Sequence, residues 1–278
     1  MNKKPRIAFV IPIASARVIG DWNLGCKYLQ QTLASIFNST NGNFRVVVAG
    51  HEKPDFSLPV DPRFKFLSLS HPISKKELIT YDDKVRDKLI KVDAAWNYAK
   101  ETWDPDYVMQ VDWDDFISSR LVEWLIKSEN NPGYRITKGW RWPNKSRFLI
   151  HIMDKFDQLC GSSLIIRKDI ADLTGPFNVI NDSVRKHVKD HCSVVPEALK
   201  STILCNNQHH RAQAYFSYLG YELSEVSFQA AIYRTNNIIS LSKAGRGDNK
   251  VHSMCWVIGY IRRTRFINRT LKKEFSLP

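Results

Sequence analysis

The chain has 278 residues, 43% of them hydrophobic, and a formal net charge of +13 at pH 7. This composition excludes a disordered protein, and the length allows one substantial core or two tightly fused halves. No apolar run reaches the roughly 18 residues of a transmembrane helix, and no signal peptide is recognisable, so we expect a cytoplasmic protein. The positive charge favours partners that carry phosphate: nucleic acid, anionic lipid or a nucleoside diphosphate.

The first part of the chain alternates strand-like and helix-like segments. Compact apolar runs predict buried strands, and apolar residues recurring every three or four positions predict amphipathic helices. In chain order we predict a strand at 6–13, a helix at 23–37 capped by Asp21 or Asn23, strands at 44–50 and 64–69, a helix at 82–100 and a strand at 107–112. Such alternation implies right-handed crossovers and a parallel sheet, hence an α/β fold.

The rest of the chain contains shorter segments. We predict a helix at 121–128, a turn at 130–133, a strand at 162–167, a helix at 208–219 and one or two short strands within 222–234. Residues 134–156 are rich in aromatic and basic side chains and receive no predicted element. The halves divide near residue 116 without a flexible linker, so we expect one fused globule. The five cysteines include no CxxC pair and are expected to be reduced core thiols.

An acidic cluster follows the predicted strand at 107–112. Asp112, Asp114 and Asp115 lie within four residues, at the end of a strand where α/β sheets bind ligands. Their mutual repulsion would raise their pKa values, and a divalent cation relieves it; hard carboxylate oxygens suit Mg²⁺ or Mn²⁺, which then bridge nucleotide phosphates. The alternative is that Asp114 or Asp115 merely caps a helix beginning at Phe116. Taken alone, the cluster favours neither interpretation.

The segment Tyr-Val-Met-Gln-Val-Asp-Trp-Asp-Asp at 107–115 resembles the strand and DxD motif of GT-A glycosyltransferases, especially the large inverting family typified by bacterial polysaccharide enzymes. Further similar segments follow in the same order along the chain: residues 9–12, Asp83-Lys84 with the helix through Ala99, residues 161–167, Gln208-His209 ahead of Gly220-Tyr221, and Tyr233-Arg234 with Asn236-Asn237 and Ser240.

The resemblance implies a GT-A (Rossmann-like) fold, with a mostly parallel central sheet flanked by helices in a single fused catalytic domain. That domain would cover residues 1–245, divided into a nucleotide-sugar half at 1–115 and an acceptor half at 116–245. A flexible loop and a basic tail at 246–278 would follow it.

The implied activity is metal-dependent transfer of a sugar, with inversion, from a nucleoside-diphosphate sugar to a hydroxyl of a glycan or lipid-linked acceptor in cell-surface polysaccharide biosynthesis. Mn²⁺ or Mg²⁺ would be bound by Asp112 and Asp114, with His252 as a third ligand. The residues assigned to the donor are Pro12, Glu52, Asp83, Lys84, Asp112 and Trp113. Typical members end the second strand in an acidic pair; here only Glu52 is acidic, and Asp83 would take over part of that role.

The catalytic residues implied by the resemblance are His209, His210 and Asp115. His209 stands where the family has its catalytic aspartate, and an imidazole with a pKa of about 6.5 suits a general base. On a helix, His210 would point about 100° away from it. The alternative for both histidines is exposure to solvent at a helix start. Asp115 would bind the donor sugar's hydroxyls or support the metal.

Several basic and aromatic residues have two interpretations. Lys84, Lys88 and Lys91 would present ammonium groups to the diphosphate, although for Lys88 and Lys91 a solvated helix flank is favoured. Trp140 and Trp142 would form a stacking platform for the acceptor, or pack in the core.

The tail at 256–275 is basic and amphipathic, which suits peripheral binding to an anionic membrane surface on the inner face of the cell membrane, or a helix packed on the catalytic domain.

Three rival functions follow from the same residues. A nucleotidyltransferase would share the fold, but residues 12–17 contain no glycine for a phosphate loop. A nucleic-acid-binding protein would explain the charge but not the aspartates, and no binding motif is present, so we expect no nucleic-acid partner. Because His209 departs from the family, a catalytically inactive sugar- or nucleotide-binding module is the main alternative.

Overall fold

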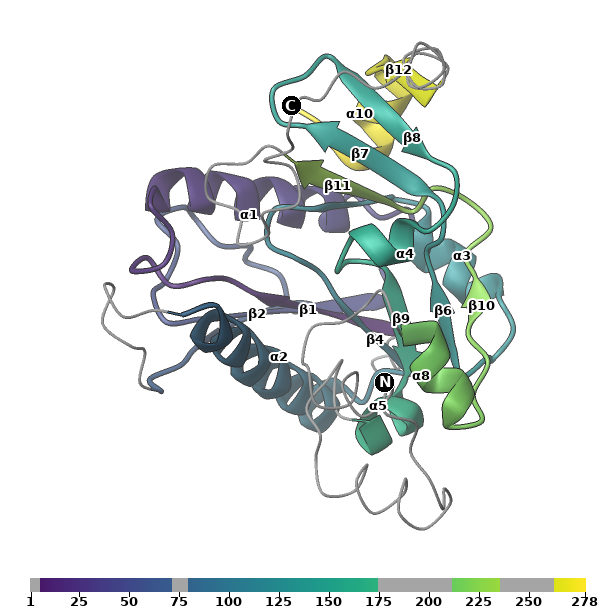
Figure 1. The fold of residues 1–278 in the computed structure, drawn as a ribbon. Helices are drawn as coiled ribbons and strands as arrows, with labels where there is room; N and C mark the ends of the chain where they lie inside the picture. The colour runs from purple at the N-terminus through teal and green to yellow at the C-terminus, as the bar shows by residue number, and fades with distance from the viewer. Residues whose placement is uncertain (1–5, 72–79, 175–211, 236–262) are drawn as a thin grey trace.

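The computed structural model describes residues 6–71, 80–174, 212–235 and 263–278. Two sheets organise these residues (Figure 1). The seven-stranded central sheet has the order β10-β6-β9-β4-β1-β2-β3, and the five-stranded second sheet has the order β12-β8-β7-β11-β5.

The central sheet is built on four neighbouring parallel strands. They are β3 (Phe64–Ser68), β2 (Phe44–Gly50), β1 (Ile7–Pro12) and β4 (Tyr107–Gln110). Beyond β4 the sheet continues with β9 (Leu164–Arg167), antiparallel to β4, then β6 (Gly133–Arg135), antiparallel to β9, and β10 (Ser224–Glu225), parallel to β6. All residues of β1 and β4 are buried, as expected of strands covered on both faces.

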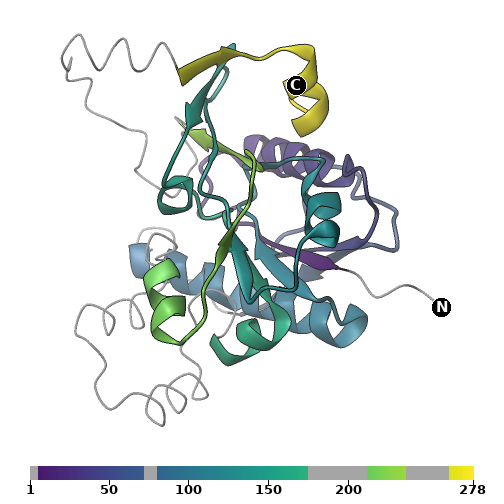
Figure 2. The ribbon, with the colours of Figure 1, turned by 90° about the vertical axis from the view of Figure 1, so that its right-hand side faces the viewer.

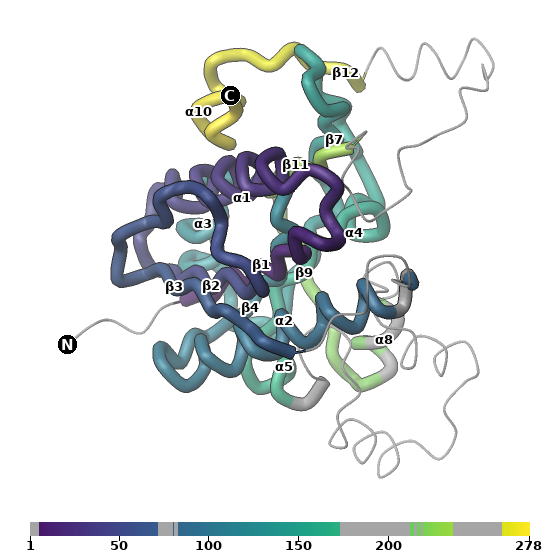
Figure 3. The backbone as a smooth tube through the Cα atoms, turned by 90° about the vertical axis from the view of Figure 1, so that its left-hand side faces the viewer, coloured from purple at the N-terminus to yellow at the C-terminus, as the bar shows by residue number. Residues whose placement is uncertain are grey.

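Helices cover both faces of this sheet. Helix α1 (Trp22–Phe37) lies on one face, and α2 (Tyr81–Trp103) lies on the other with α5 (Lys168–Thr174) and α8 (Ala212–Tyr218) (Figures 1 and 3). The fully buried Leu29 packs on the α1 side, whereas Val92 and Trp96 of α2 pack on the opposite side. The predicted fold class, α/β with a mostly parallel central sheet flanked by helices, is therefore confirmed.

The second sheet lies on the α1 side of the molecule (Figures 1 and 2). Its strands are β12 (Thr264–Phe266), β8 (Phe148–Ile152), β7 (Gly139–Pro143), β11 (Ala231–Thr235) and β5 (Phe116–Ile117). Helix α10 (Arg269–Phe275) packs on it, and a separate cluster of apolar side chains forms there: Phe116, Trp142, Leu149, Ile232, Phe275 and Leu277. Two short helices, α3 (Leu121–Lys127) and α4 (Phe156–Leu159), complete the described elements.

Local signals explain where the two long helices begin. Asp21 is the N-cap of α1, and its carboxylate accepts a hydrogen bond from the Leu24 amide at 3.0 Å. Thr80 and Asp83 form a capping box at the start of α2. The predicted cap Asp21 is thus confirmed.

The structure corrects two sequence interpretations. Phe116 begins no helix: it belongs to β5, which pairs with β11, so the helix-cap interpretation of Asp114 and Asp115 is wrong. The strand predicted at 107–112 ends at Gln110. Strands β6, β7 and β8 lie within or next to the stretch at 134–156 that received no element, because three to five residues are too few to show a period.

Candidate active site

The candidate site lies at the carboxyl edge of the central sheet. Pro12 ends β1, Gly50 ends β2, and Asp112 follows the end of β4. Since β1 is parallel to both β2 and β4, with Pro12 opposite Ala49 and Val10 opposite Gln110, these ends meet at one edge. Three residues assigned from sequence to the donor, Pro12, Glu52 and Asp112, are therefore at the edge where α/β sheets bind ligands.

Asp112 presents a partly exposed carboxylate at this edge. Its side chain is 27% exposed, and its Oδ1 accepts a hydrogen bond from Lys88 Nζ at 2.7 Å. The Asp112 amide donates to Ser162 Oγ at 2.8 Å. A Cβ at Gly161 would come within 2.8 Å of Asp112 Oδ2, so a glycine there leaves room for the carboxylate.

Asp115 is fully buried. Its carboxylate accepts hydrogen bonds from Ser162 Oγ at 2.7 Å, from Cys160 Sγ at 3.2 Å and from the Arg234 amide at 3.2 Å. Burial first, then the charges of Asp114 and Asp112, raise the pKa of this carboxyl well above its usual value. Ser162 links the two aspartates, because it accepts from the Asp112 amide and donates to Asp115.

Asp114 is buried near the guanidinium of Arg234, a residue to which the sequence analysis gave no role. Arg234 is 1% exposed, and its guanidinium carbon lies 3.9 Å from the ring centroid of Tyr28. Burial lowers the pKa of Arg234, and the charge of Asp114 is the largest effect opposing that decrease. The one sequence signal was an arginine inside the apolar segment at 230–235, where a buried cation needs a buried anion.

Glu52 connects the loops that follow β1 and β2. Its Oε1 accepts from Ser15 Oγ at 2.8 Å, and its Oε2 accepts from the Ala16 amide at 3.1 Å. Both carboxylate oxygens therefore stabilise the loop after Pro12. Any contact of Glu52 with a donor would use the remaining lone pairs of these oxygens.

The two lysines expected on a solvated helix flank are both engaged by carboxylates. Lys88 pairs with Asp112, and Lys91 is fully buried, with its Nζ 2.5 Å from Asp87 Oδ2. The solvated-flank interpretation is therefore wrong for Lys91. Asp83, assigned to the donor, accepts hydrogen bonds from Thr80 in the capping box, and Lys84 follows it as a half-buried residue.

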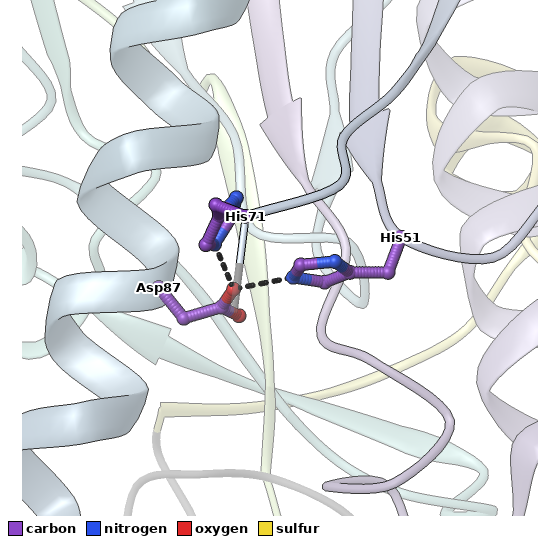
Figure 4. Close-up of side chains that lie close together, drawn as sticks. All are labelled: His51, His71 and Asp87. Carbon is purple, nitrogen blue, oxygen red and sulfur yellow. Dashed lines mark hydrogen bonds and ion pairs between the residues drawn. The ribbon is translucent and has the colours of Figure 1, made fainter. Parts of the chain in front are cut away.

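Asp87 also joins two histidines that the sequence analysis did not single out as site residues. Its Oδ1 lies 2.8 Å from His51 Nε2 and 2.9 Å from His71 Nε2 (Figure 4). The three residues form a group that could hold a metal ion, the one such group of His, Cys, Asp or Glu side chains among the described residues. Their possible ligand atoms all lie within 4.8 Å of one another. The spacing of Asp87 and Lys91 at four residues on a helix was a signal for their ion pair, but nothing in the sequence connected them to histidines of two other loops.

The tryptophans divide between packing and partial exposure. Trp113 is buried and stacks on Tyr28 with ring centroids 6.4 Å apart. Trp142 is 6% exposed and belongs to the cluster with Phe116, as its core-packing interpretation predicted. Trp140 is half-buried beside His151, with ring centroids 4.8 Å apart.

The remaining predicted residues fall outside or at the edge of the described chain. His209, His210 and His252 lie outside the described residues, as do Cys192, Cys205 and Cys255. Of the predicted tail, residues 263–278 are described, and there Phe275 and Leu277 are buried while Arg269, Lys272 and Lys273 are exposed. No helix in the described ranges has both the length and the apolarity to cross a membrane.

The fold and this edge define an α/β protein with a partly exposed carboxylate, buried carboxylates and paired cations beyond the ends of parallel strands. No protein-family model and no curated protein matches the chain. Among solved structures, it is similar at 12% identity to residues 1–349 of TarS from S. aureus, covering 82% of this chain and 60% of that one with a TM-score of 0.39.

Two further solved structures are similar at the same coarse level. For the glycosyltransferase GlyE of Streptococcus pneumoniae TIGR4 the identity is 9%, the coverage 81% of this chain and 46% of that one, and the TM-score 0.37. For an active-site mutant of LgtC the identity is 10%, the coverage 96% of this chain and 99% of that one, and the TM-score 0.37. The chain thus spans about half of GlyE and less than two thirds of the TarS fragment.

Proposed function

We propose that this protein is a glycosyltransferase that transfers a sugar from a nucleoside-diphosphate sugar to an acceptor hydroxyl. The observation that carries the proposal is Asp112, a partly exposed carboxylate at the carboxyl end of β4, beside the ends of β1 and β2. It belongs to the segment that resembles a DxD motif. A partly exposed acidic group at this edge suits a phosphate-bearing ligand only with a cation between them.

The carboxylate oxygens of Asp112 and Asp114 are hard ligands that fit Mn²⁺ or Mg²⁺, and these two residues would hold the ion, with His252 as a third ligand. When bound, the ion would neutralise the negative charge of the leaving diphosphate. Lys88, which pairs with Asp112, would contact the diphosphate of a bound donor.

Asp115 acts in this proposal as a positioning residue. It is fully buried, so contact with a donor sugar would require its neighbours to move, whereas its bond to Ser162 supports the Asp112 amide. The donor side of the site would be formed by Pro12, Glu52, Asp83, Lys84 and Trp113. His209 or His210 would remove the acceptor proton in an inverting reaction.

The acceptor in this proposal is a glycan or a lipid-linked sugar. The exposed Arg269, Lys272 and Lys273 support contact with an anionic surface, at about 1 kcal/mol per basic residue near it.

A second candidate function is favoured by the cations that already lie near the aspartates. Lys88 pairs with Asp112, and the charge of Asp114 partly opposes the lowering of the Arg234 pKa that burial causes. A sugar-nucleotide-binding module that needs no metal would use these cations in place of an ion.

The test is a screen of nucleoside-diphosphate sugars with and without Mn²⁺, following both binding and release of free diphosphate. We expect metal-dependent release from one donor, reduced about 100-fold or more in Asp112→Asn, which corresponds to about 2.7 kcal/mol of barrier. Asp61→Asn is the matched control, because Asp61 precedes β3 and so lies at the opposite edge of the sheet.

Donor binding without metal and without release would favour the binding module. The transferase proposal fails if no donor binds or is cleaved with any divalent ion, or if Asp112→Asn and Asp61→Asn behave alike.

A further inference from the structure

Three side chains from three separate elements converge beside the candidate active site. His51 follows β2, His71 lies a few residues beyond β3, and Asp87 lies in the second turn of α2. The three side chains are only 10%, 18% and 11% exposed. Figure 4 shows both imidazoles directing a ring nitrogen at the same carboxylate.

The backbone explains why these residues meet. Strands β2 and β3 are parallel neighbours, with Gly50 opposite Ser68, so the segments that follow them leave the sheet at the same edge. The N-terminal half of α2 passes over that edge and brings Asp87 to both histidines. The cluster is thus fixed by the sheet and one helix rather than by a single loop.

Lys91 fixes the orientation of the Asp87 carboxylate. Its buried ammonium group binds Oδ2 at 2.5 Å, one helical turn from Asp87, which leaves Oδ1 facing the two imidazoles. In metal centres, partners of this kind orient a ligating carboxylate through the oxygen that the metal does not use. Glu52 lies next to His51 in the chain, and its negative charge reaches Lys91.

The three ligand atoms all lie within 4.8 Å of one another, a spacing that suits one transition-metal ion. Ligands about 2.0–2.2 Å from a tetrahedral ion lie about 3.3–3.6 Å from one another. The observed separations of 2.8 and 2.9 Å would therefore widen by about 0.4–0.8 Å, within the reach of small side-chain rotations. Two imidazoles with one carboxylate favour ions such as zinc over Mg²⁺, which prefers all-oxygen sites.

We propose that His51, His71 and Asp87 bind one zinc-like divalent ion, at a site separate from Asp112 and Asp114. The ion ties the segments after β2 and β3 to α2. With three protein ligands, it keeps one coordination position for water or another oxygen ligand. This site is independent of the proposed sugar transfer, because it requires neither a donor nor the acidic cluster.

Calorimetric titration of the chelator-treated, desalted full chain with zinc chloride tests the site. We expect one ion per chain to bind through these residues, with an affinity at least tenfold lower in His51→Ala and in His71→Ala. Zinc should raise the melting temperature of the wild type more than that of either variant. The matched control is His151→Ala, which removes a half-buried histidine of β8, and Asp112→Asn should also retain zinc binding.

A rescue variant separates metal binding from a structural role of the histidine. His71→Cys retains a zinc ligand but not an imidazole, so it should bind zinc better than His71→Ala and, with Co²⁺, show a thiolate-to-cobalt absorption band. Asp87→Asn is a weaker test, because it leaves the buried Lys91 without its anion. The proposal is overturned if zinc does not bind, or if its affinity is the same in the wild type, His51→Ala and His71→Ala.

Discussion

The absence of a Cβ atom at Gly161 leaves space for the Asp112 carboxylate. An alanine Cβ would come within 2.8 Å of Asp112 Oδ2, closer than two such atoms can approach. We therefore expect Gly161→Ala to rotate the carboxylate away. Because a displacement of about 1 Å can cost about 100-fold in rate, the release of diphosphate in the proposed reaction should fall by about tenfold to 100-fold.

The stability of Gly161→Ala should change little, since the displaced atom ends a short side chain that is partly exposed. Gly42→Ala is a suitable control: it precedes β2 at the opposite edge, and its nearest neighbour is the tip of the flexible Arg63 side chain at 3.2 Å. Donor turnover and thermal melting of both variants check this expectation. Unchanged turnover in Gly161→Ala would show that the position of the Asp112 carboxylate does not matter.

Tyr107 makes the stability of the protein depend on pH in the alkaline range. Its hydroxyl donates to the Asn131 carbonyl at 2.8 Å, and burial raises its pKa to about 12 from an ordinary 10.0. The folded state therefore favours the neutral phenol. This contribution to stability is fully present below pH 10 and is lost as the pH rises through about 12.

Removal of the hydroxyl should flatten this dependence. Tyr107→Phe should be less stable than the wild type by about 1 kcal/mol at neutral pH, because a buried hydrogen bond is lost. The difference should shrink as the pH rises above 10, since only the wild type carries the phenol that titrates. Urea unfolding of both proteins at several pH values gives the slope of the free energy of unfolding against pH for each. Equal slopes above pH 10 would contradict the expectation.

At the scale of elements, the accuracy of sequence-based prediction followed the length of each pattern. Strand β2 was predicted with its observed bounds because a compact apolar run, interrupted only by Arg45, ends in a glycine. Helix α1 was predicted within one residue because a cap and four apolar positions agree. Strands β7 and β8 were missed: their aromatic and basic residues are placed by partners in a second sheet, and no local pattern records those partners.

The same limit applies to the candidate site. The sequence made Asp112 a candidate, because three aspartates next to a buried strand form a local signal, and its role stays a prediction. It missed the electrostatic interaction of Asp114 with Arg234, which is 120 positions away, and the convergence of His51, His71 and Asp87, which depends on strand order. Residues that act together across the chain become visible only when the sheet brings their loops to one edge.

At the scale of the whole molecule, the end of the chain completes the second sheet. Phe275 is fully buried against side chains that include Phe116 and Trp142, and the Ser119 amide donates to the Glu274 carbonyl at 3.0 Å. Strand β11 of this sheet carries Arg234, whose amide binds Asp115. The packing of α10 thus stabilises the sheet that contains β11, the strand that binds Asp115 of the acidic cluster.

We expect Phe275→Ala to lower the free energy of unfolding by about 3–5 kcal/mol, because it leaves a cavity where little can collapse. The matched control is Phe266→Ala: Phe266 lies on β12 and is 68% exposed, so its loss should cost about 1 kcal/mol or less. Urea unfolding curves of both variants provide the comparison. If the two substitutions lower the free energy of unfolding equally, α10 does not pack on the second sheet. Phe275 and Leu277 would then be available to contact another surface.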